Sequence, residues 1–195
     1  MFQGYSQETV DFMWGIRFNN ERGWFLAHKD DYQQHLLAPT RELGQAVYEG
    51  LSAALPQEPL ILKVSRIYRD ARRLHGQGPY KDHLWFCVRT GDQDWTGRPT
   101  FYFEIAPDYY SYGMGFWAAS AATMTRYRQP DYVRSKGQVS DLLRPWYQKK
   151  SLTLSHEVPL DESLYSPDFA SRVTEDLKTL LPFYRYFAAL CAAAE

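Results

Sequence analysis

The order of local sequence patterns predicts an α+β protein in which helices pack on a mostly antiparallel β-sheet. Segments with helical spacing occupy both ends of the chain, and short runs rich in β-branched and aromatic residues lie in the middle. The connection between the second and the third of these runs is too short to hold a crossover helix, which favours antiparallel pairing. With 195 residues, the chain has a length at which one core can bury all elements. We therefore expect a single domain over residues 1–195.

The N-terminal part of the chain is predicted to be helical. Ser6 can cap a first helix, and Asn20 can cap a second one over residues 21–29. Over residues 31–55, apolar side chains recur at three-to-four or seven-residue spacing, which predicts a longer helix. Pro39 is compatible with this pattern only if a new helix begins there, because proline lacks the backbone N–H that an interior position needs.

The middle of the chain is predicted to form strands. The runs cover residues 60–68, 84–88, 100–106 and 112–117. Glycine, proline and aspartate separate them, as is typical of strands joined by turns. Since the connection from the second run to the third is short, these two runs should pair antiparallel. The sheet is therefore predicted to be an antiparallel meander.

The C-terminal part returns to helical patterns. Ser120 can open a helix that runs to about residue 128, whereas residues 141–144 begin a loop-rich stretch. The sequence at 166–168 has a cap followed by proline and predicts the start of a helix with one apolar face. Pro182 should kink or restart that helix.

Composition excludes several classes of protein. Hydrophobic residues make up 45% of the chain, charged residues 23%, and the net charge is −1, which is typical of a globular protein and not of a disordered or collagen-like one. No apolar run reaches the roughly 18 residues of a membrane-spanning helix, and the first residues lack the regions of a signal peptide. We therefore expect a cytoplasmic protein that does not bind membranes. Cys87 and Cys191 are predicted to be buried, reduced thiols.

Positive charge is concentrated in two segments of the chain. Residues 61–81 hold six basic side chains against one acidic one, and residues 121–150 hold seven against two. If the two segments meet in space, they create a local positive field in a protein whose remaining residues carry a net negative charge. Such a field selects anionic ligands.

The densest basic stretch is Arg66-Ile67-Tyr68-Arg69-Asp70-Ala71-Arg72. In an extended strand, Arg66, Asp70 and Arg72 would project from one face. Two guanidinium groups beside a carboxylate can hold a phosphate or a carboxylate, because arginine presents a planar fork of donors that the aspartate can orient. The alternative is that Asp70 pairs with an arginine and the other charges are solvated.

A glycine-punctuated loop follows the basic stretch and returns Tyr80 and Lys81 towards it. The loop lacks the spacing of a phosphate-binding P-loop, and Gly113-Met114-Gly115 lacks the third glycine of a dinucleotide-binding fingerprint. The segments together predict an anion site made of Arg66, Arg69, Asp70, Arg72, Tyr80, Lys81 and Arg126.

Recognisable catalytic and metal-binding patterns are missing from the sequence. The five histidines and two cysteines do not have metal-ligand spacing, so neither a metal nor a cofactor is predicted. No nucleophile elbow occurs. Asp70 and Glu104 could approach each other across neighbouring strands as an acid–base pair. The sequence leaves open whether the protein is an enzyme, and it does not predict an oligomeric state.

Several motifs together resemble a known family. They are Asn19-Asn20 with Trp24-Phe25, Arg66 to Arg72, Pro79-Tyr80-Lys81, Phe101-Tyr102, and Gly113-Met114-Gly115 before a helix with Arg126. Their order and spacing resemble the bacterial family called domain of unknown function 2461, from about Val10 to the final helix. The resemblance implies one α+β domain and marks the arginine stretch and Pro-Tyr-Lys as family signatures. It implies no substrate.

The chain departs from the family pattern after Arg72. Members of the family usually read Arg-Phe-Ser-x-Asp-Lys-Ser at this point, whereas here Gly76 and Gln77 replace the acid and the lysine. If that acid were a general base in the family, this protein would lack it.

Three functions remain open at the level of sequence. The first is a pocket for a small ligand that bears a phosphate or a carboxylate. The second is nucleic-acid binding, with bases stacked on Tyr68 or Trp85, which the pI of about 6.5 disfavours. The third is a non-catalytic protein-interaction domain in which the arginines are paired internally.

Overall fold

A five-stranded antiparallel sheet forms the centre of the protein. The computed structural model describes residues 1–70, 72, 78–91, 95–128, 140–142 and 144–192. Within these residues the strands are β1 (Leu60–Val64), β2 (Leu84–Thr90), β3 (Pro99–Ile105), β4 (Tyr109–Phe116) and β5 (Thr153–Pro159). Their spatial order follows the chain, and every neighbouring pair is antiparallel. The predicted meander is confirmed, including the pairing of the second and third runs.

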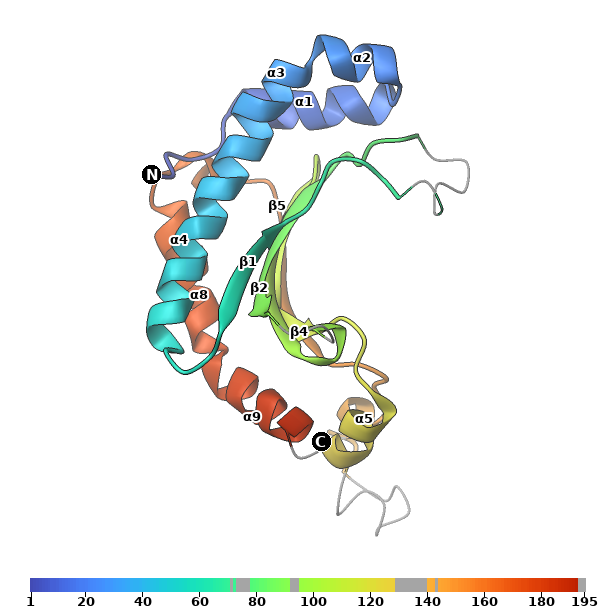
Figure 1. The fold of residues 1–195 in the computed structure, drawn as a ribbon, viewed down its shortest axis with the longest axis vertical. Helices are drawn as coiled ribbons and strands as arrows, with labels where there is room; N and C mark the ends of the chain where they lie inside the picture. Colours follow the sequence, from blue (N-terminus) through green and yellow to red (C-terminus); the bar gives the residue numbers. More distant parts are fainter. Residues whose placement is uncertain (71, 73–77, 92–94, 129–139, 143, 193–195) are drawn as a thin grey trace.

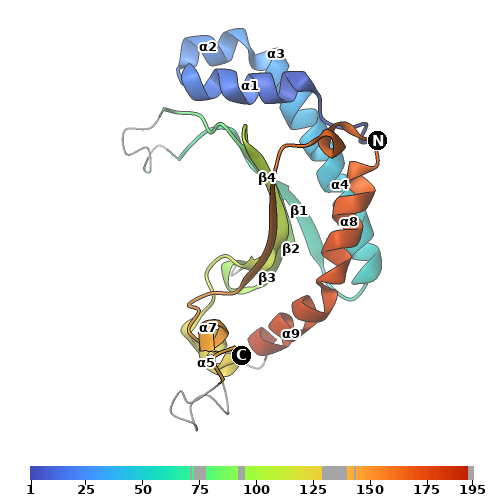
Figure 2. The same cartoon turned by 180° about the vertical axis from the view of Figure 1, so that it is seen from behind.

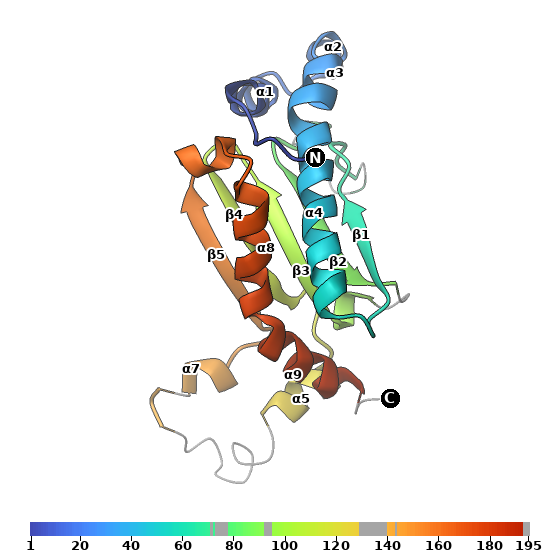
Figure 3. The same cartoon turned by 90° about the vertical axis from the view of Figure 1, so that its left-hand side faces the viewer.

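Helices lie on one face of the sheet and at its two ends. They are α1 (Gln7–Phe18), α2 (Arg22–Ala27), α3 (Lys29–Asp31), α4 (Ala38–Ala54), α5 (Ala121–Tyr127), α7 (Arg144–Tyr147), α8 (Phe169–Thr179) and α9 (Leu181–Ala192). Helices α4 and α8 lie side by side across one sheet face (Figure 3). Helices α1 to α3 lie beyond one end of the sheet, and α5 and α7 lie beyond the other (Figure 2). The α+β class is confirmed.

The two faces of the sheet differ in what covers them. On β3, Phe101, Phe103 and Ile105 are completely buried under the helices, whereas Tyr102 and Glu104 alternate with them and point the other way. The face that carries Tyr102 and Glu104 is concave, and no described helix lies over it (Figure 2). The open face is therefore the sheet surface that a ligand can reach.

The long N-terminal helix is continuous through Pro39, but it changes its hydrogen bonding. Residues Tyr32–Leu37 form a π-helical segment, η1, that leads directly into α4. Pro39 has no N–H to offer the carbonyl of His35, and the hydroxyl of Thr9 donates to that carbonyl instead. A side chain of α1 therefore satisfies the acceptor that proline leaves free, and the two helices are joined there.

The strand predicted over residues 60–68 is shorter than expected, because β1 ends at Val64. The hydroxyl of Ser65 accepts a hydrogen bond from the Trp85 backbone N–H, at 3.1 Å, in place of a backbone carbonyl. Tyr68 then forms an isolated bridge with Tyr80. The face pattern predicted for Arg66, Asp70 and Arg72 is consequently wrong, since the three residues do not belong to one strand.

Strand β5 is not predicted from the sequence. Of its side chains only Leu154 and Val158 are half-buried, so its apolar pattern is weak. The neighbouring strand β4 is adapted to it, because a Cβ at Gly113 would collide with the backbone of Leu154 and one at Gly115 with that of Leu152. The Gly-Met-Gly motif therefore permits close approach of β4 and β5.

Several other local predictions are confirmed. The hydroxyl of Ser120 caps α5 by accepting a hydrogen bond from Thr123, and α9 restarts next to Pro182. Cys87 and Cys191 are buried thiols, and neither forms a disulfide bond in the described part of the chain. In the part of the chain that the structure describes, no helix combines the length and the apolar character needed to cross a bilayer.

Candidate functional site on the concave face of the sheet

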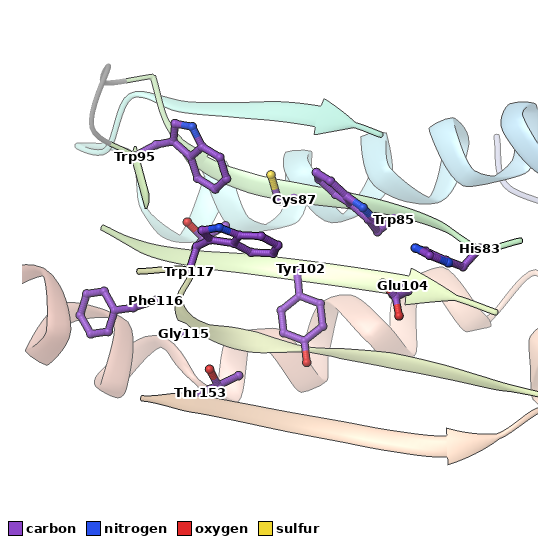
Figure 4. Close-up of a pocket in the computed structure, with 11 residues that line it drawn as sticks. His83, Trp85, Cys87, Trp95, Tyr102, Glu104, Gly115, Phe116, Trp117 and Thr153 are labelled. Atoms are coloured by element: carbon purple, nitrogen blue, oxygen red, sulfur yellow. The ribbon is translucent and has the colours of Figure 1, made fainter. Parts of the chain in front are cut away.

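The concave face holds a cavity of about 390 Å³ (Figure 4). Side chains of β2, β3 and β4 form its floor, and the 3-10 turn η3 (Trp95–Gly97) and the start of β5 contribute to its sides. The lining residues are His83, Trp85, Cys87, Trp95, Thr100, Tyr102, Glu104, Gly115, Phe116, Trp117 and Thr153. The volume is sufficient for a small organic molecule.

Aromatic rings make up much of this lining. The rings of Trp95 and Trp117 lie 6.4 Å apart, and the side chain of Trp117 is 72% exposed. Cations of the protein cover parts of two tryptophans: the Lys81 ammonium lies 5.4 Å from the ring centre of Trp85, and the Arg89 guanidinium lies 4.7 Å from that of Trp95. Such a surface can stack against a flat apolar group.

Polar groups gather at one end of the cavity, around Glu104. This residue lies on β3 directly opposite Trp85 of β2 and Ser111 of β4. The Tyr109 hydroxyl donates to a carboxylate oxygen of Glu104 at 2.7 Å, and this hydrogen bond, together with burial, raises the pKa of Tyr109. The hydroxyls of Tyr102 and Ser111 are 3.2 Å apart. Tyr109 is thus a hydrogen-bond partner of Glu104.

Lys81 lies beside this polar end. Its backbone N–H donates to the carbonyl of Ile67 at 2.7 Å, which fixes the start of the side chain. The pKa of the Lys81 ammonium is lowered to about 8, chiefly by burial; the charge of Glu104 acts to raise it, and the charges of Arg69 and Arg66 act to lower it. The ammonium is therefore a desolvated cation with two like charges nearby, which an anion would stabilise.

Asp82 and His83 form a hydrogen-bonded pair at the same end. Nδ1 of His83 lies 3.0 Å from Oδ1 of Asp82, and Arg17 of α1 donates to the other Asp82 oxygen at 2.6 Å. These hydrogen bonds hold the pKa of Asp82 far below its usual range, although burial acts in the opposite direction. Arg17 also pairs with Asp108 at 2.6 Å, so α1, the segment before β2 and the β3–β4 turn are tied together.

Three residues predicted to bind an anion are occupied by the protein's own groups. Nε and Nη2 of Arg72 donate to the carboxylate of Asp70 at 3.0 and 2.8 Å, and the Arg72 side chain is 87% exposed. Arg69 donates to the carbonyl of Tyr80 at 2.8 Å and lies 4.0 Å from Asp82. The acid–base pair expected from Asp70 and Glu104 is not formed, since each binds another partner.

The remaining predicted residues are divided between two regions. Arg66 is exposed and close enough to Lys81 to affect its charge. The ring of Tyr80 is buried and stacks on Phe25 at 4.3 Å, so it serves packing. Arg126 lies on α5, near the opposite end of the sheet, where it donates to the carbonyl of Leu190 at 3.2 Å (Figure 1). The structure therefore brings Lys81 and Arg66 together but leaves Arg126 apart.

Gly76 and Gln77, where the sequence departs from the family pattern, lie outside the described residues.

The segment that carries Lys81 is held by Asn20. Instead of capping α2, where Glu21 occupies the cap position, Asn20 uses its amide to bind both backbone groups of Tyr80, each at 2.9 Å. A Cβ at Gly78 would collide with the Asn20 side chain, so the close approach requires glycine there. One side chain therefore fixes the loop that precedes the site.

Replacement of Asn20 should loosen this attachment. We expect Asn20→Ala to lower the free energy of unfolding by about 2 kcal/mol, because two partly buried backbone groups lose their partner. Asn19→Ala is the matched control, with an expected loss below about 1 kcal/mol, since the Asn19 side chain is exposed. Urea denaturation of the two variants measures the difference, and equal losses would contradict the role given to Asn20.

Most of the cavity lining escapes sequence reasoning. His83, Trp95 and Trp117 lie outside or at the ends of the predicted strands, and nothing local indicates that they share a surface. A signal does exist on the strands, where Trp85, Cys87, Tyr102 and Glu104 occupy alternate positions and interrupt buried apolar residues. This alternation identifies the open face, but not its depth.

The fold and the site define an α+β protein with one helix-covered sheet face and one open, aromatic face. Comparison with known families agrees with the motif resemblance: the model of a family described as conserved hypothetical proteins, DUF2461, matches residues 8–143. The chain belongs to this family. The matched segment contains Lys81, His83, Trp85 and Glu104, and ends before β5. No curated protein and no solved structure matches the chain.

Proposed function

We propose that the concave face binds a small organic molecule that has a flat apolar body and one anionic group, a carboxylate or a phosphate. The body stacks in the aromatic cavity, and the anionic group pairs with Lys81 at its polar end. The observation that carries this proposal is the position of a half-buried ammonium group next to an open cavity lined by tryptophans.

The chemistry of the lining supports the choice of a flat body. Trp85, Trp95, Trp117 and Tyr102 offer large ring surfaces, and Trp117 in particular leaves most of its surface in contact with water. Removing such surface from water on binding is favourable by about 25 cal/mol per Å². Burial of a ligand ring in this cavity therefore contributes more binding free energy than an ion without an apolar body could obtain.

The charges around Lys81 support the choice of an anion. Arg66 and Arg69 both repel its charge, and Glu104 is the acidic residue that opposes them. An anion beside Lys81 would relieve this repulsion. Arg69 and Arg72 already bind groups of the protein, so Lys81 and Arg66 are the residues that would recognise the anion. Arg126 is excluded from this site because it lies on α5, where it binds the carbonyl of Leu190.

Three compounds that each carry a phenyl ring test this proposal. Phenylacetate and phenyl phosphate carry the anionic group, and phenylacetamide does not; binding is followed by tryptophan fluorescence. We expect the dissociation constant of phenylacetate to be at least about tenfold below that of phenylacetamide, since a hydrogen bond to a charged group contributes about 1.5–3 kcal/mol. Trp85→Ala should weaken all three, whereas Trp14→Ala, on α1 and outside the cavity, should weaken none.

Other outcomes would assign the site differently. Equal affinity for phenylacetate and phenylacetamide would contradict anion recognition. Tighter binding of phenethylamine would make Glu104 the recognising charge. Salt-sensitive binding of a single-stranded oligonucleotide that Trp85→Ala abolishes would favour nucleic-acid binding instead.

A further inference from the structure

His83 is the one histidine among the cavity-lining residues. Its ring lies at the same end of the cavity as Glu104 (Figure 4). One ring nitrogen, Nδ1, lies 3.0 Å from the Asp82 carboxylate, and in the part of the chain that the structure describes Nε2 makes no hydrogen bond. An imidazole with one nitrogen held by a carboxylate and the other free has the arrangement of a general base.

Asp82 is itself held in its ionised form. Arg17 donates to it at 2.6 Å and Arg69 lies 4.0 Å away, so the carboxylate keeps its charge without a ligand. An ionised Asp82 accepts the Nδ1 proton of His83, which selects the tautomer whose Nε2 lone pair is available. Neither Arg17 nor Asp82 is among the cavity-lining residues, and both act by positioning the imidazole.

We propose that His83 is a catalytic base that moves a proton on a bound 2-oxo acid with an aromatic ring, and that Asp82 is its positioning residue. This inference rests on the proposed function, which places the ring in the aromatic cavity and the carboxylate at Lys81 and Arg66. The carbon next to the ketone then lies between the ring and the carboxylate, at the end of the cavity where His83 is found.

The step is an interconversion of keto and enol forms. His83 Nε2 takes a proton from the carbon between the ring and the ketone; that C–H electron pair forms the new C=C bond, and the carbonyl pair moves to oxygen. The Lys81 ammonium stabilises the negative oxygen and gives it a proton. Lys81 is suited to this role because its ammonium lies 5.4 Å from the ring centre of Trp85, beside the polar end of the cavity. His83 releases its proton to water and Lys81 regains one, so the net change is the isomerisation alone.

Phenylpyruvate in D₂O provides the test. Proton transfer replaces hydrogen by deuterium at the carbon next to the ketone, and NMR follows the loss of that signal above the buffer rate. We expect His83→Asn to lower the protein-dependent rate by about 100-fold or more, as for other general bases. His156→Asn, which alters an exposed histidine outside this cavity, should leave the rate unchanged.

Two further variants separate a catalytic from a structural role. In His83→Ala, added imidazole should restore part of the exchange, which a misfolded protein would not show. In Asp82→Asn, the rate at saturating phenylpyruvate should fall while the affinity measured by tryptophan fluorescence stays within about twofold. A rate in His83→Asn equal to that of the unaltered protein would overturn the role of His83.

The inference and the proposed function can fail separately. If phenylpyruvate binds with the affinity expected of an anionic ring compound but no exchange above buffer occurs, the catalytic assignment is wrong and the binding site stands. If neither phenylpyruvate nor phenylacetate binds, the proposed function itself is wrong.

Discussion

Replacement of Lys81 by methionine is expected to weaken phenylacetate binding by about tenfold to 100-fold and to leave phenylacetamide binding almost unchanged. Methionine keeps the length and apolar contacts of the side chain over Trp85 but removes the charge. The size of the loss corresponds to a charge-assisted hydrogen bond. Fluorescence titration with both compounds measures it.

The pKa of Lys81 predicts how phenylacetate binding depends on pH. The pKa of Lys81 in the free protein is about 8, and a bound anion raises it because the anion favours the charged ammonium. Affinity for phenylacetate should therefore be constant at lower pH and fall by up to tenfold per pH unit above about 8, as the free protein loses this proton. The charged groups that act on Lys81 are Glu104, Arg69 and Arg66.

Lys29→Met is the control for both measurements, because Lys29 is exposed on α3, away from the cavity. It should change neither the affinity nor the pH profile. If the profile above pH 8 persisted in Lys81→Met, another group would be responsible for it, and Lys81 would not be the anion's partner.

The second large effect is expected in the core. Phe103→Ala should lower the free energy of unfolding by about 3–5 kcal/mol. Phe103 is completely buried in the middle strand, and its ring lies 5.4 Å from that of Phe86, 5.9 Å from Phe169 and 6.4 Å from both Tyr5 and Tyr110. It thus contacts the sheet, α8 and the N-terminal segment at once, and alanine would leave a cavity among all three.

Urea denaturation measures this loss, with Phe18→Ala as the matched control. Phe18 is 75% exposed at the end of α1, so the same truncation there should cost less than about 1 kcal/mol. A loss below about 1 kcal/mol in Phe103→Ala would show that the elements do not share one core around this ring.

Much of the fold could be predicted because it follows from burial along single elements. The apolar positions of α4 and α8 indicate which side of each helix is covered, and this periodicity is local. The cap at Ser120 is local as well, because its hydroxyl binds the backbone N–H of Thr123. The meander follows from loop lengths. Strand β5 could not be predicted in this way, because most of its side chains face water and its stability depends on pairing with β4.

The basic stretch shows where local reasoning fails. Its composition indicates an anion site, yet β1 ends at Val64, Arg72 binds Asp70, and Arg69 binds the carbonyl of Tyr80. Among the described charges of this stretch, Arg66 acts on Lys81 beside the cavity. Whether a guanidinium group is available to a ligand depends on the nearest acceptor in space, which sequence spacing does not reveal.

The sequence by itself determined the α+β class, the antiparallel meander and the family. Only the tertiary structure decided that the sheet has an open concave face, that its cavity is lined by tryptophans from distant segments, and that Asp82 and His83 form a pair at its end. The physical reason is the separation along the chain of the residues that determine each feature. Periodic burial is a property of a few consecutive residues, whereas a cavity or an ion pair such as Arg17 with Asp82, 65 residues apart, exists only once folding has brought its parts together.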